Sequence, residues 1–220
     1  MQTEKPKRVK RKRFDINALS EQERLEYWNN VTEDHLFSFY KPRTVKFVRE
    51  KTKEFTDSMF ELNGGKLTAH EPGCAYAMTL RNINPDIHYL GTDPAENMII
   101  QDRQIYADLP NAKFEVDSVE TGHGKYRHDV LLMLCMLDSL PHEYSMTLIP
   151  LMADMCERGM LFISLRHEKN NSLKDNWSYY RNFNSHNPEE IQELADKLGF
   201  DCELDVRENF SNFAAVWTRR

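Results

Sequence analysis

Two acidic residues, Glu71 and Asp93, each end a short segment of strand-forming residues and are the first candidates for chemistry in the sequence. Gly73, Cys74 and Ala75 follow Glu71 as a turn of small residues, which lets the backbone come close to a bound ligand. Asp93 lies about 20 residues further on, where an acid can accept hydrogen bonds from a ribose diol. The pattern predicts a nucleotide-type crevice at the carboxyl ends of two parallel strands.

Strands and helices alternate from residue 66 onward, and these are the elements that would position the two acids. The alternation predicts an α/β fold with a mainly parallel seven-stranded sheet, helices on both faces and a C-terminal antiparallel hairpin. Residues 129–135 are apolar after the first, as expected of a central strand that is buried on both faces. The expected strands are 66–71, 87–92, 112–117, 128–135, 159–165, 201–208 and 212–218, and the expected helices of the domain are 75–83, 95–107, 143–157 and 188–198.

The segment before the sheet is predicted to be helical. Ser20 and Glu23 make a capping box, which favours a helix from residue 21. Pro42 suits the first turn of a second helix, which Asn63-Gly64-Gly65 would end. We therefore divide the chain into a basic tail at 1–13, a helical extension at 14–63 and a main domain at 64–220.

An aromatic and polar insertion interrupts the main domain at residues 168–187. Trp177, Tyr179, Tyr180 and Phe183 lie there among Asn and Ser residues. Residues 14–40 and this insertion are the segments expected to recognise the substrate, the insertion as a lid or as a wall of the acceptor site. The alternative is an insertion whose aromatic side chains pack back on the sheet.

The net charge of −6 over 220 residues is unevenly distributed. Residues 1–13 carry seven Lys or Arg and one Glu, a charge of +6, which leaves −12 for the rest of the chain. The tail is therefore a candidate nuclear address, nucleic-acid clamp or handle for an acidic partner, with a solubilising tail as the alternative. A body of such negative charge argues against binding a nucleic-acid duplex, which needs an extended positive surface.

The cysteines and the hydropathy indicate a reducing intracellular compartment. The cysteines are widely spaced and form no C-x-x-C pair, so neither a disulfide framework nor a metal site is expected. No apolar run approaches the roughly 20 residues that span a bilayer, so no membrane association is expected. We expect a soluble cytoplasmic protein, with the basic tail compatible with a nuclear location. The four cysteines are Cys74, Cys135, Cys156 and Cys202.

The order of these segments resembles that of class I S-adenosylmethionine-dependent methyltransferases over roughly residues 36–218. Residues 71–77 (EPGCAYA) are similar to the family's first loop of acid-x-Gly-x-Gly-x-Gly, with alanine at two of the three glycine positions. Residues 89–98 (YLGTDPAENM) resemble the second motif, and residues 112–118 (AKFEVDS) the third. Residues 126–141 are similar to the fourth strand and its loop, and 157–167 to the fifth strand.

The resemblance implies a Rossmann-like fold that binds S-adenosylmethionine and releases S-adenosylhomocysteine. Asp93 would hold the ribose hydroxyls, and Asp117 the adenine amino group with Ser118 beside the ring. Residues 39–43 (FYKPR) resemble a segment that approaches the carboxylate end of the cofactor. The full set of expected cofactor-binding residues is Tyr40, Arg43, Glu71, Gly73, Cys74, Ala75, Asp93, Pro94, Met98, Asp117, Ser118 and Cys135.

The expected reaction is methyl transfer to a small molecule or a protein side chain, with nucleic acid as a less favoured acceptor. An oxygen acceptor needs a base within hydrogen-bond reach, whereas a nitrogen acceptor needs only desolvation and orientation. We expect Asp138, Tyr40 and His142 near the acceptor as catalytic residues, although many members of the family carry histidine where this chain has Asp138 or Ser139. The sequence does not define the acceptor or the oligomeric state.

Two other functions stay open at this point. Alanine at positions 75 and 77, together with the absent histidine, motivates the alternative of a catalytically inactive binding or scaffold subunit. A nicotinamide-dependent reductase could use a similar crevice, but the loop led by Glu71 and the terminal hairpin disfavour it. Binding of the sulfonium cofactor separates the first two hypotheses.

Overall fold

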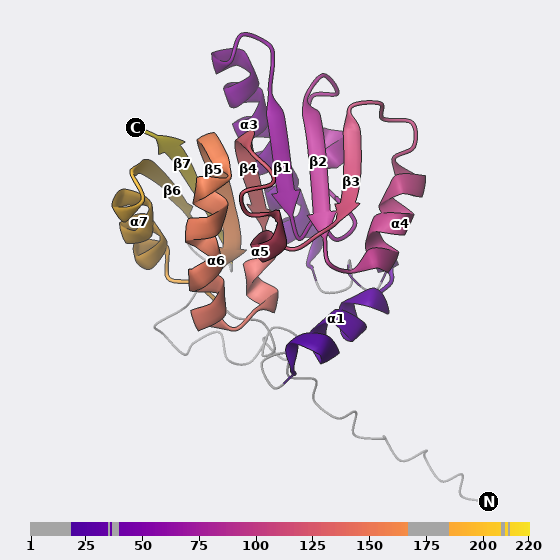
Figure 1. Cartoon of the computed structure of the whole chain (residues 1–220). Helices are drawn as coiled ribbons and strands as arrows, with labels where there is room; N and C mark the ends of the chain where they lie inside the picture. The colour runs from indigo at the N-terminus through magenta and orange to yellow at the C-terminus, as the bar shows by residue number, and fades with distance from the viewer. Residues whose placement is uncertain (1–18, 35, 37–39, 167–184, 208–209, 211) are drawn as a thin grey trace, which may run out of the picture.

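The computed structural model describes residues 19–34, 36, 40–166, 185–207, 210 and 212–220, and its centre is one seven-stranded sheet (Figure 1). The strand order is β3-β2-β1-β4-β5-β7-β6. The first five strands are parallel, and β7 runs antiparallel to both β5 and β6. This confirms the predicted α/β fold with its C-terminal hairpin. The strands are β1 Thr68–Pro72, β2 His88–Asp93, β3 Ala112–Val116, β4 His128–Leu134, β5 Cys156–Leu165, β6 Phe200–Val206 and β7 Asn212–Arg219.

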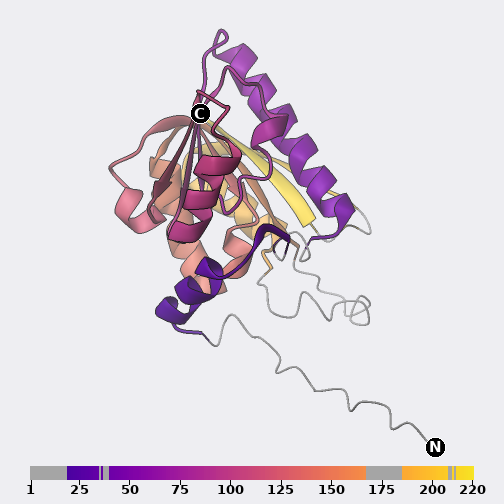
Figure 2. The same cartoon turned by 90° about the vertical axis from the view of Figure 1, so that its right-hand side faces the viewer.

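Helices bury both faces of the sheet. In β4, Val130 and Leu132 pack with α3 (Pro42–Leu62) and α4 (Glu96–Ile105), while Leu131 and Met133 point to the opposite face. Figures 1 and 2 show α3 on one side and the helices α6 and α7 on the other. Because successive side chains of a strand alternate between faces, a strand covered twice must be apolar throughout, as predicted for this one. The covering pair is α6 His142–Asp154 and α7 Pro188–Lys197.

Three of the predicted helix starts, those of α1, α3 and α7, are confirmed. Ser20 accepts from the N–H of Glu23, whose carboxylate in turn accepts from the N–H of Ser20, at the start of α1 (Glu21–Asn29). Pro42 is the first residue of α3. Asn187 caps α7, and Gly199 follows that helix at φ +81°, a conformation that glycine adopts without strain.

One predicted helix, at residues 75–83, is wrong. The segment is a series of turns that ends in a short 3-10 helix, Leu80–Asn82. Ala75 and Ala77 have φ of +48° and +40°, in the left-handed region, which interrupts a right-handed helix. Two short elements were not predicted: α5 (Val119–Gly122) and the 3-10 turn Leu137–Ser139.

Helix α1 lies beyond the carboxyl ends of β1, β2 and β3, as Figures 1 and 2 show. The Asn97 side chain at the start of α4 donates to the carbonyl of Asn29 at 2.9 Å. The Tyr76 hydroxyl donates to the carbonyl of Val31 at 2.8 Å, so two contacts fasten this N-terminal segment to the rim of the sheet. The basic tail and nearly all of the insertion at 168–187 lie outside the described residues. Among the helices that are described, none has the length and apolar composition needed to cross a membrane.

Candidate functional site

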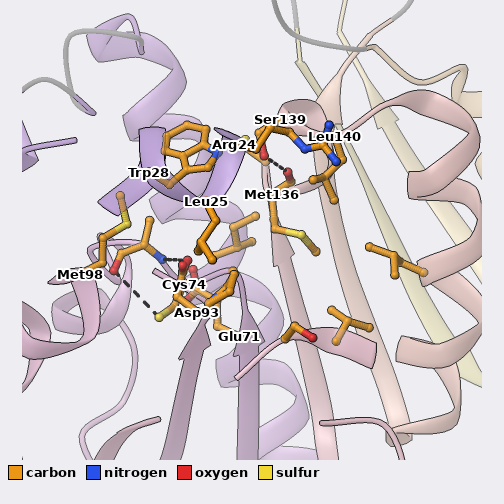
Figure 3. Close-up of a pocket in the computed structure, with 18 of the residues that line it drawn as sticks. Arg24, Leu25, Trp28, Glu71, Cys74, Asp93, Met98, Met136, Ser139 and Leu140 are labelled. Carbon is orange, nitrogen blue, oxygen red and sulfur yellow. Dashed lines mark hydrogen bonds between the residues drawn. The ribbon is translucent and has the colours of Figure 1, made fainter. Parts of the chain in front are cut away.

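A pocket lies between the carboxyl ends of β1–β4 and helix α1 (Figure 3). It contains about 1300 Å³ of empty space, including its open mouth. Most of the residues predicted to bind the cofactor line it, although they come from five separate segments of the chain. These residues are Tyr40, Glu71, Gly73, Cys74, Ala75, Asp93, Pro94, Met98, Asp117, Ser118 and Cys135.

Asp93 is buried at the end of β2, and its carboxylate connects two segments of the pocket wall. One oxygen accepts from the N–H of Ala75 at 3.0 Å, and the other accepts from the N–H of Ala95 at 2.8 Å. Burial raises the pKa of Asp93 to about 6, although these two N–H groups act in the opposite direction. At neutral pH the group is therefore mainly an ionised acceptor that fixes the loop after β1 and has lone pairs left for a ligand.

Glu71 lies on the floor of the pocket at the end of β1. Its carboxylate accepts from the Tyr89 hydroxyl at 2.7 Å and from the Thr79 hydroxyl at 3.4 Å. Burial raises the pKa of Glu71 to about 8, against these hydrogen bonds and with a further rise from the charge of Asp93. Without a ligand the side chain is therefore largely protonated at pH 7, and a nearby cation would favour its ionised form.

Glu71→Gln is expected to change how stability depends on pH. The folded protein keeps a proton on Glu71 between its ordinary pKa of 4.5 and about 8, whereas the unfolded chain releases it. Wild-type stability therefore falls as pH rises through this window, by at most about 1.4 kcal/mol per pH unit from this group. Urea unfolding at several pH values should show a free-energy difference between Glu71→Gln and wild type that increases with pH.

The same measurement on Glu61→Gln controls for the loss of one negative charge, because Glu61 is exposed on α3. A pH-independent difference between Glu71→Gln and wild type would contradict the assignment of a buried proton to this position.

The loop after β1 keeps the backbone of a glycine-rich turn at positions that hold alanine. Gly73, Ala75 and Ala77 all have positive φ, at +64°, +48° and +40°. Cys135, on the opposite wall after β4, is left-handed as well, at +62°. The alanines therefore do not convert the loop to ordinary dihedral angles; they occupy the left-handed conformation at a cost of about 1–2 kcal/mol each.

Ala75→Gly is consequently expected to stabilise the protein by about 0.5–1 kcal/mol, because relief of the left-handed strain exceeds the added entropy of an unfolded glycine. Ala77→Gly is the matched variant, and its gain is offset because Ala77 is fully buried and its methyl contributes about 0.8 kcal/mol of packing. Urea midpoints of both variants measure the effect. Clear destabilisation by Ala75→Gly would show that this residue is not strained.

Asp117, after β3, stays ionised in the pocket wall. Its carboxylate accepts from Lys125 Nζ at 2.7 Å, from the Tyr126 hydroxyl at 2.8 Å and from the Thr121 hydroxyl. Partial burial raises the pKa of Asp117, but the hydrogen bonds outweigh it and hold the pKa below its usual range. Its Ser118 neighbour caps α5, so the backbone at this end of the pocket is fixed.

Three residues predicted to act in the site do not line this pocket. Arg43 is in the first turn of α3, and its guanidinium carbon lies 5.6 Å from the centroid of the Phe210 ring. Asp138 is buried, accepts from the Leu165 N–H at 3.1 Å and from the Ser164 hydroxyl, and so ties the turn at 137–139 to β5. Burial raises the pKa of Asp138 to about 7.

His142 begins α6 with its ring 3.5 Å from the Glu190 carboxylate. Of the residues expected to be catalytic, Tyr40 alone is among those that line the described pocket.

Residues 14–40 were expected to recognise the substrate, but the individual residues that line this part of the pocket were not predicted. Glu21, Arg24, Leu25 and Trp28 face it from one side of α1, and Met136, Ser139, Leu140 and Tyr144 face it from the segment after β4. The spacing of the first four residues, i, i+3, i+4 and i+7, defines a single helix face and was visible in the sequence. Figure 3 shows Arg24 and Trp28 on one side of the pocket, Glu71, Cys74 and Asp93 on the other, and Leu25 between the two groups.

The fold and the site together define an α/β protein with a pocket at the carboxyl ends of its parallel strands. No protein-family model and no curated protein sequence matches the chain. Solved structures do. The magnesium protoporphyrin IX methyltransferase of Synechocystis PCC 6803, solved with bound S-adenosylhomocysteine, matches with a TM-score of 0.71 and 13% identity over 91% of this chain and 100% of that chain.

Two further structures agree. A SAM-dependent methyltransferase from Leishmania major matches with a TM-score of 0.67 and 12% identity, over 90% of this chain and 82% of that one. The DhpI complex with S-adenosylhomocysteine matches with a TM-score of 0.63 and 11% identity, over 89% and 95%. Identities this low establish the fold alone. The chain has the fold of the class I S-adenosylmethionine-dependent methyltransferases.

Proposed function

We propose that this protein binds S-adenosylmethionine and transfers its methyl group to a small-molecule or protein acceptor. The observation that carries the proposal is the buried carboxylate of Asp93, which lines the pocket at the end of β2 and braces the loop after β1. A ribose diol is a ligand for which such an acceptor is suited. The similar structures that contain S-adenosylmethionine or S-adenosylhomocysteine support S-adenosylmethionine as the molecule that carries this ribose.

The residues around the pocket fit the parts of this cofactor. Asp93 would accept from the ribose hydroxyls, and Asp117 with Ser118 would bind the adenine. Glu71 and the backbone at Gly73 and Cys135 would surround the methionine part. Burial holds the Glu71 carboxyl group largely in its neutral form. A positively charged ammonium or sulfonium group beside it would stabilise the ionised carboxylate and would in turn be stabilised by it.

The bound cofactor supplies a methyl group already activated by its positively charged sulfur. The protein must then orient the acceptor in line with that bond and keep water away. Apolar side chains from α1 and from the segment after β4 enclose the pocket, and Leu25 and Met136 are among them. The Tyr40 hydroxyl is the group that we assign to orienting the acceptor and its departing proton.

Calorimetric titration with S-adenosylhomocysteine tests this function. We expect micromolar binding to the wild type, and methyl transfer from labelled S-adenosylmethionine to an acceptor in a metabolite or cell extract. Absence of detectable binding would contradict the proposal. NADH serves as the control nucleotide, and a rise in melting temperature with NADH but not with S-adenosylhomocysteine would instead support the reductase.

The second candidate is a binding or scaffold subunit without catalytic activity. The observation that favours it is alanine at two positions where the backbone is left-handed, of which Ala75 lines the pocket and places its methyl group where the loop would approach the ligand. Tight binding of S-adenosylhomocysteine without methyl transfer in extracts would favour this candidate. A nucleic-acid acceptor is less favoured because the chain beyond its basic tail is strongly acidic.

A further inference from the structure

The proposed cofactor contacts leave part of the pocket lining unassigned, and this part includes one face of α1. Glu21, Arg24, Leu25 and Trp28 line the cavity, although no residue of this helix is fully buried. A surface helix normally turns its apolar residues toward a protein core. Trp28 packs in part against the buried cluster that contains Val31 and Met98, and both Leu25 and Trp28 stay half-exposed and line the cavity, so they have apolar surface to offer to a ligand.

Arg24 is the cation of this wall. Its Nη1 donates to the Leu19 carbonyl at 2.7 Å, which holds the side chain in place. A guanidinium has five N–H donors, so most of them remain available. Among the residues that the structure describes, no carboxylate lies within ion-pair distance of Arg24, and Glu21, one turn earlier on the same face, is not paired with it.

Trp28 supplies an aromatic surface next to this cation. Its ring packs edge-on against Tyr27, with 5.2 Å between the ring centroids, which restricts the orientation of the indole. Met136 and Leu140 face the same space from the segment after β4. A fixed aromatic ring, apolar side chains and one guanidinium together suit a flat apolar molecule that carries an anionic group.

We propose that the acceptor of this protein is an aromatic carboxylic acid, whose carboxylate binds Arg24 and whose ring packs between Trp28 and Leu140. The inference rests on the proposed methyl transfer, because it assigns the acceptor to the part of the same pocket that α1 and the segment after β4 line. Figure 3 draws Arg24 well away from Glu71, Cys74 and Asp93, which supports the acceptor rather than the cofactor as its partner.

The test measures binding of named probes to the protein saturated with S-adenosylhomocysteine. The probes are phenylacetate, indole-3-acetate and 2-naphthoate, each paired with its neutral amide. We expect at least one acid to bind wild type about tenfold more tightly than its amide, because a bidentate carboxylate pair is lost in the amide. Arg24→Gln should abolish this preference, and Trp28→Ala should weaken the acid and the amide alike.

Arg127→Gln is the matched control. It removes the same charge from a residue that precedes β4, at the far end of the sheet from the pocket, where Arg127 pairs with Glu157. The preference for the acid should survive in this variant. If wild type binds no acid more tightly than its amide, the proposal is wrong.

A second result would also overturn it. If Arg24→Gln weakens S-adenosylhomocysteine about tenfold but leaves 5′-methylthioadenosine unaffected, then Arg24 holds the carboxylate of the cofactor. The acids are titrated without S-adenosylhomocysteine as well. Failure of the wild type to bind S-adenosylhomocysteine, which would contradict the proposed function, thus remains distinguishable from failure to prefer the acids.

Discussion

Asp93→Ala is expected to reduce the affinity for S-adenosylhomocysteine by at least about 100-fold, because two hydrogen bonds to a carboxylate are worth about 1.5–3 kcal/mol each. The N–H groups of Ala75 and Ala95 also lose their acceptor, so the loop after β1 loses its attachment to β2. Calorimetry measures the affinity, and circular dichroism confirms that the variant is folded. Asp86→Ala, at an exposed turn before the same strand, is the control.

The pH dependence of binding gives an independent test of the same carboxylate. Because the pKa of Asp93 is raised to about 6, wild-type affinity should fall below that pH as the acceptor becomes protonated. Asp93→Asn cannot be protonated and should lose this part of the pH profile. Wild-type affinity that stays constant between about pH 5 and 7 would show that the ionised carboxylate is not what binds the ligand.

Gly73→Ala is expected to destabilise the protein by about 2–5 kcal/mol, the sum of a left-handed alanine and an overpacked contact. A Cβ at this position would lie 2.1 Å from Met136 Cγ and 3.0 Å from Met136 Cβ. The Cβ atom is fixed to the backbone, and Cγ can move away only if χ1 of Met136 changes to another rotamer within the packed pocket wall. The loop after β1 or the segment after β4 must therefore shift, and cofactor binding should weaken by more than about tenfold as the pocket changes shape.

Gly64→Ala separates the two contributions. Gly64 has a similar φ of +67°, but no atom lies within 4 Å of the place where its Cβ would be. This variant should lose only the conformational part, about 1–2 kcal/mol, and should bind S-adenosylhomocysteine as wild type does. Equal stability of the two variants would mean that Met136 does not press against the loop. Urea unfolding of both variants at one pH measures the difference.

Features of the fold that arise from local sequence were predictable. The Ser20 and Glu23 capping box, proline at the start of α3 and the apolar run in β4 each specify a helix start or a strand through contacts between near neighbours. The acid at the end of β2 could be placed in the crevice because parallel strands of an open sheet bring their carboxyl ends to one edge.

Features that depend on distant contacts were not predictable. The turns at residues 75–83 follow from left-handed alanines, which Asp93 and the neighbouring core hold in place against their intrinsic preference. The burial of Asp138 depends on Ser164 and Leu165, which lie in another strand. The helix face with Arg24 and Trp28 was readable in the sequence, but only the three-dimensional position of α1 shows that this face meets a cavity.

The attachment of α1 has a consequence for how the specificity of this protein can evolve. The strands of the sheet all follow Pro42, whereas one wall of the pocket comes from a helix that precedes it and has no fully buried residue. Substitutions at such positions usually change stability by less than about 0.5 kcal/mol. Selection can therefore alter what this wall recognises while the sheet stays unchanged, so under the proposed function the choice of acceptor can diverge before the residues around Asp93 do.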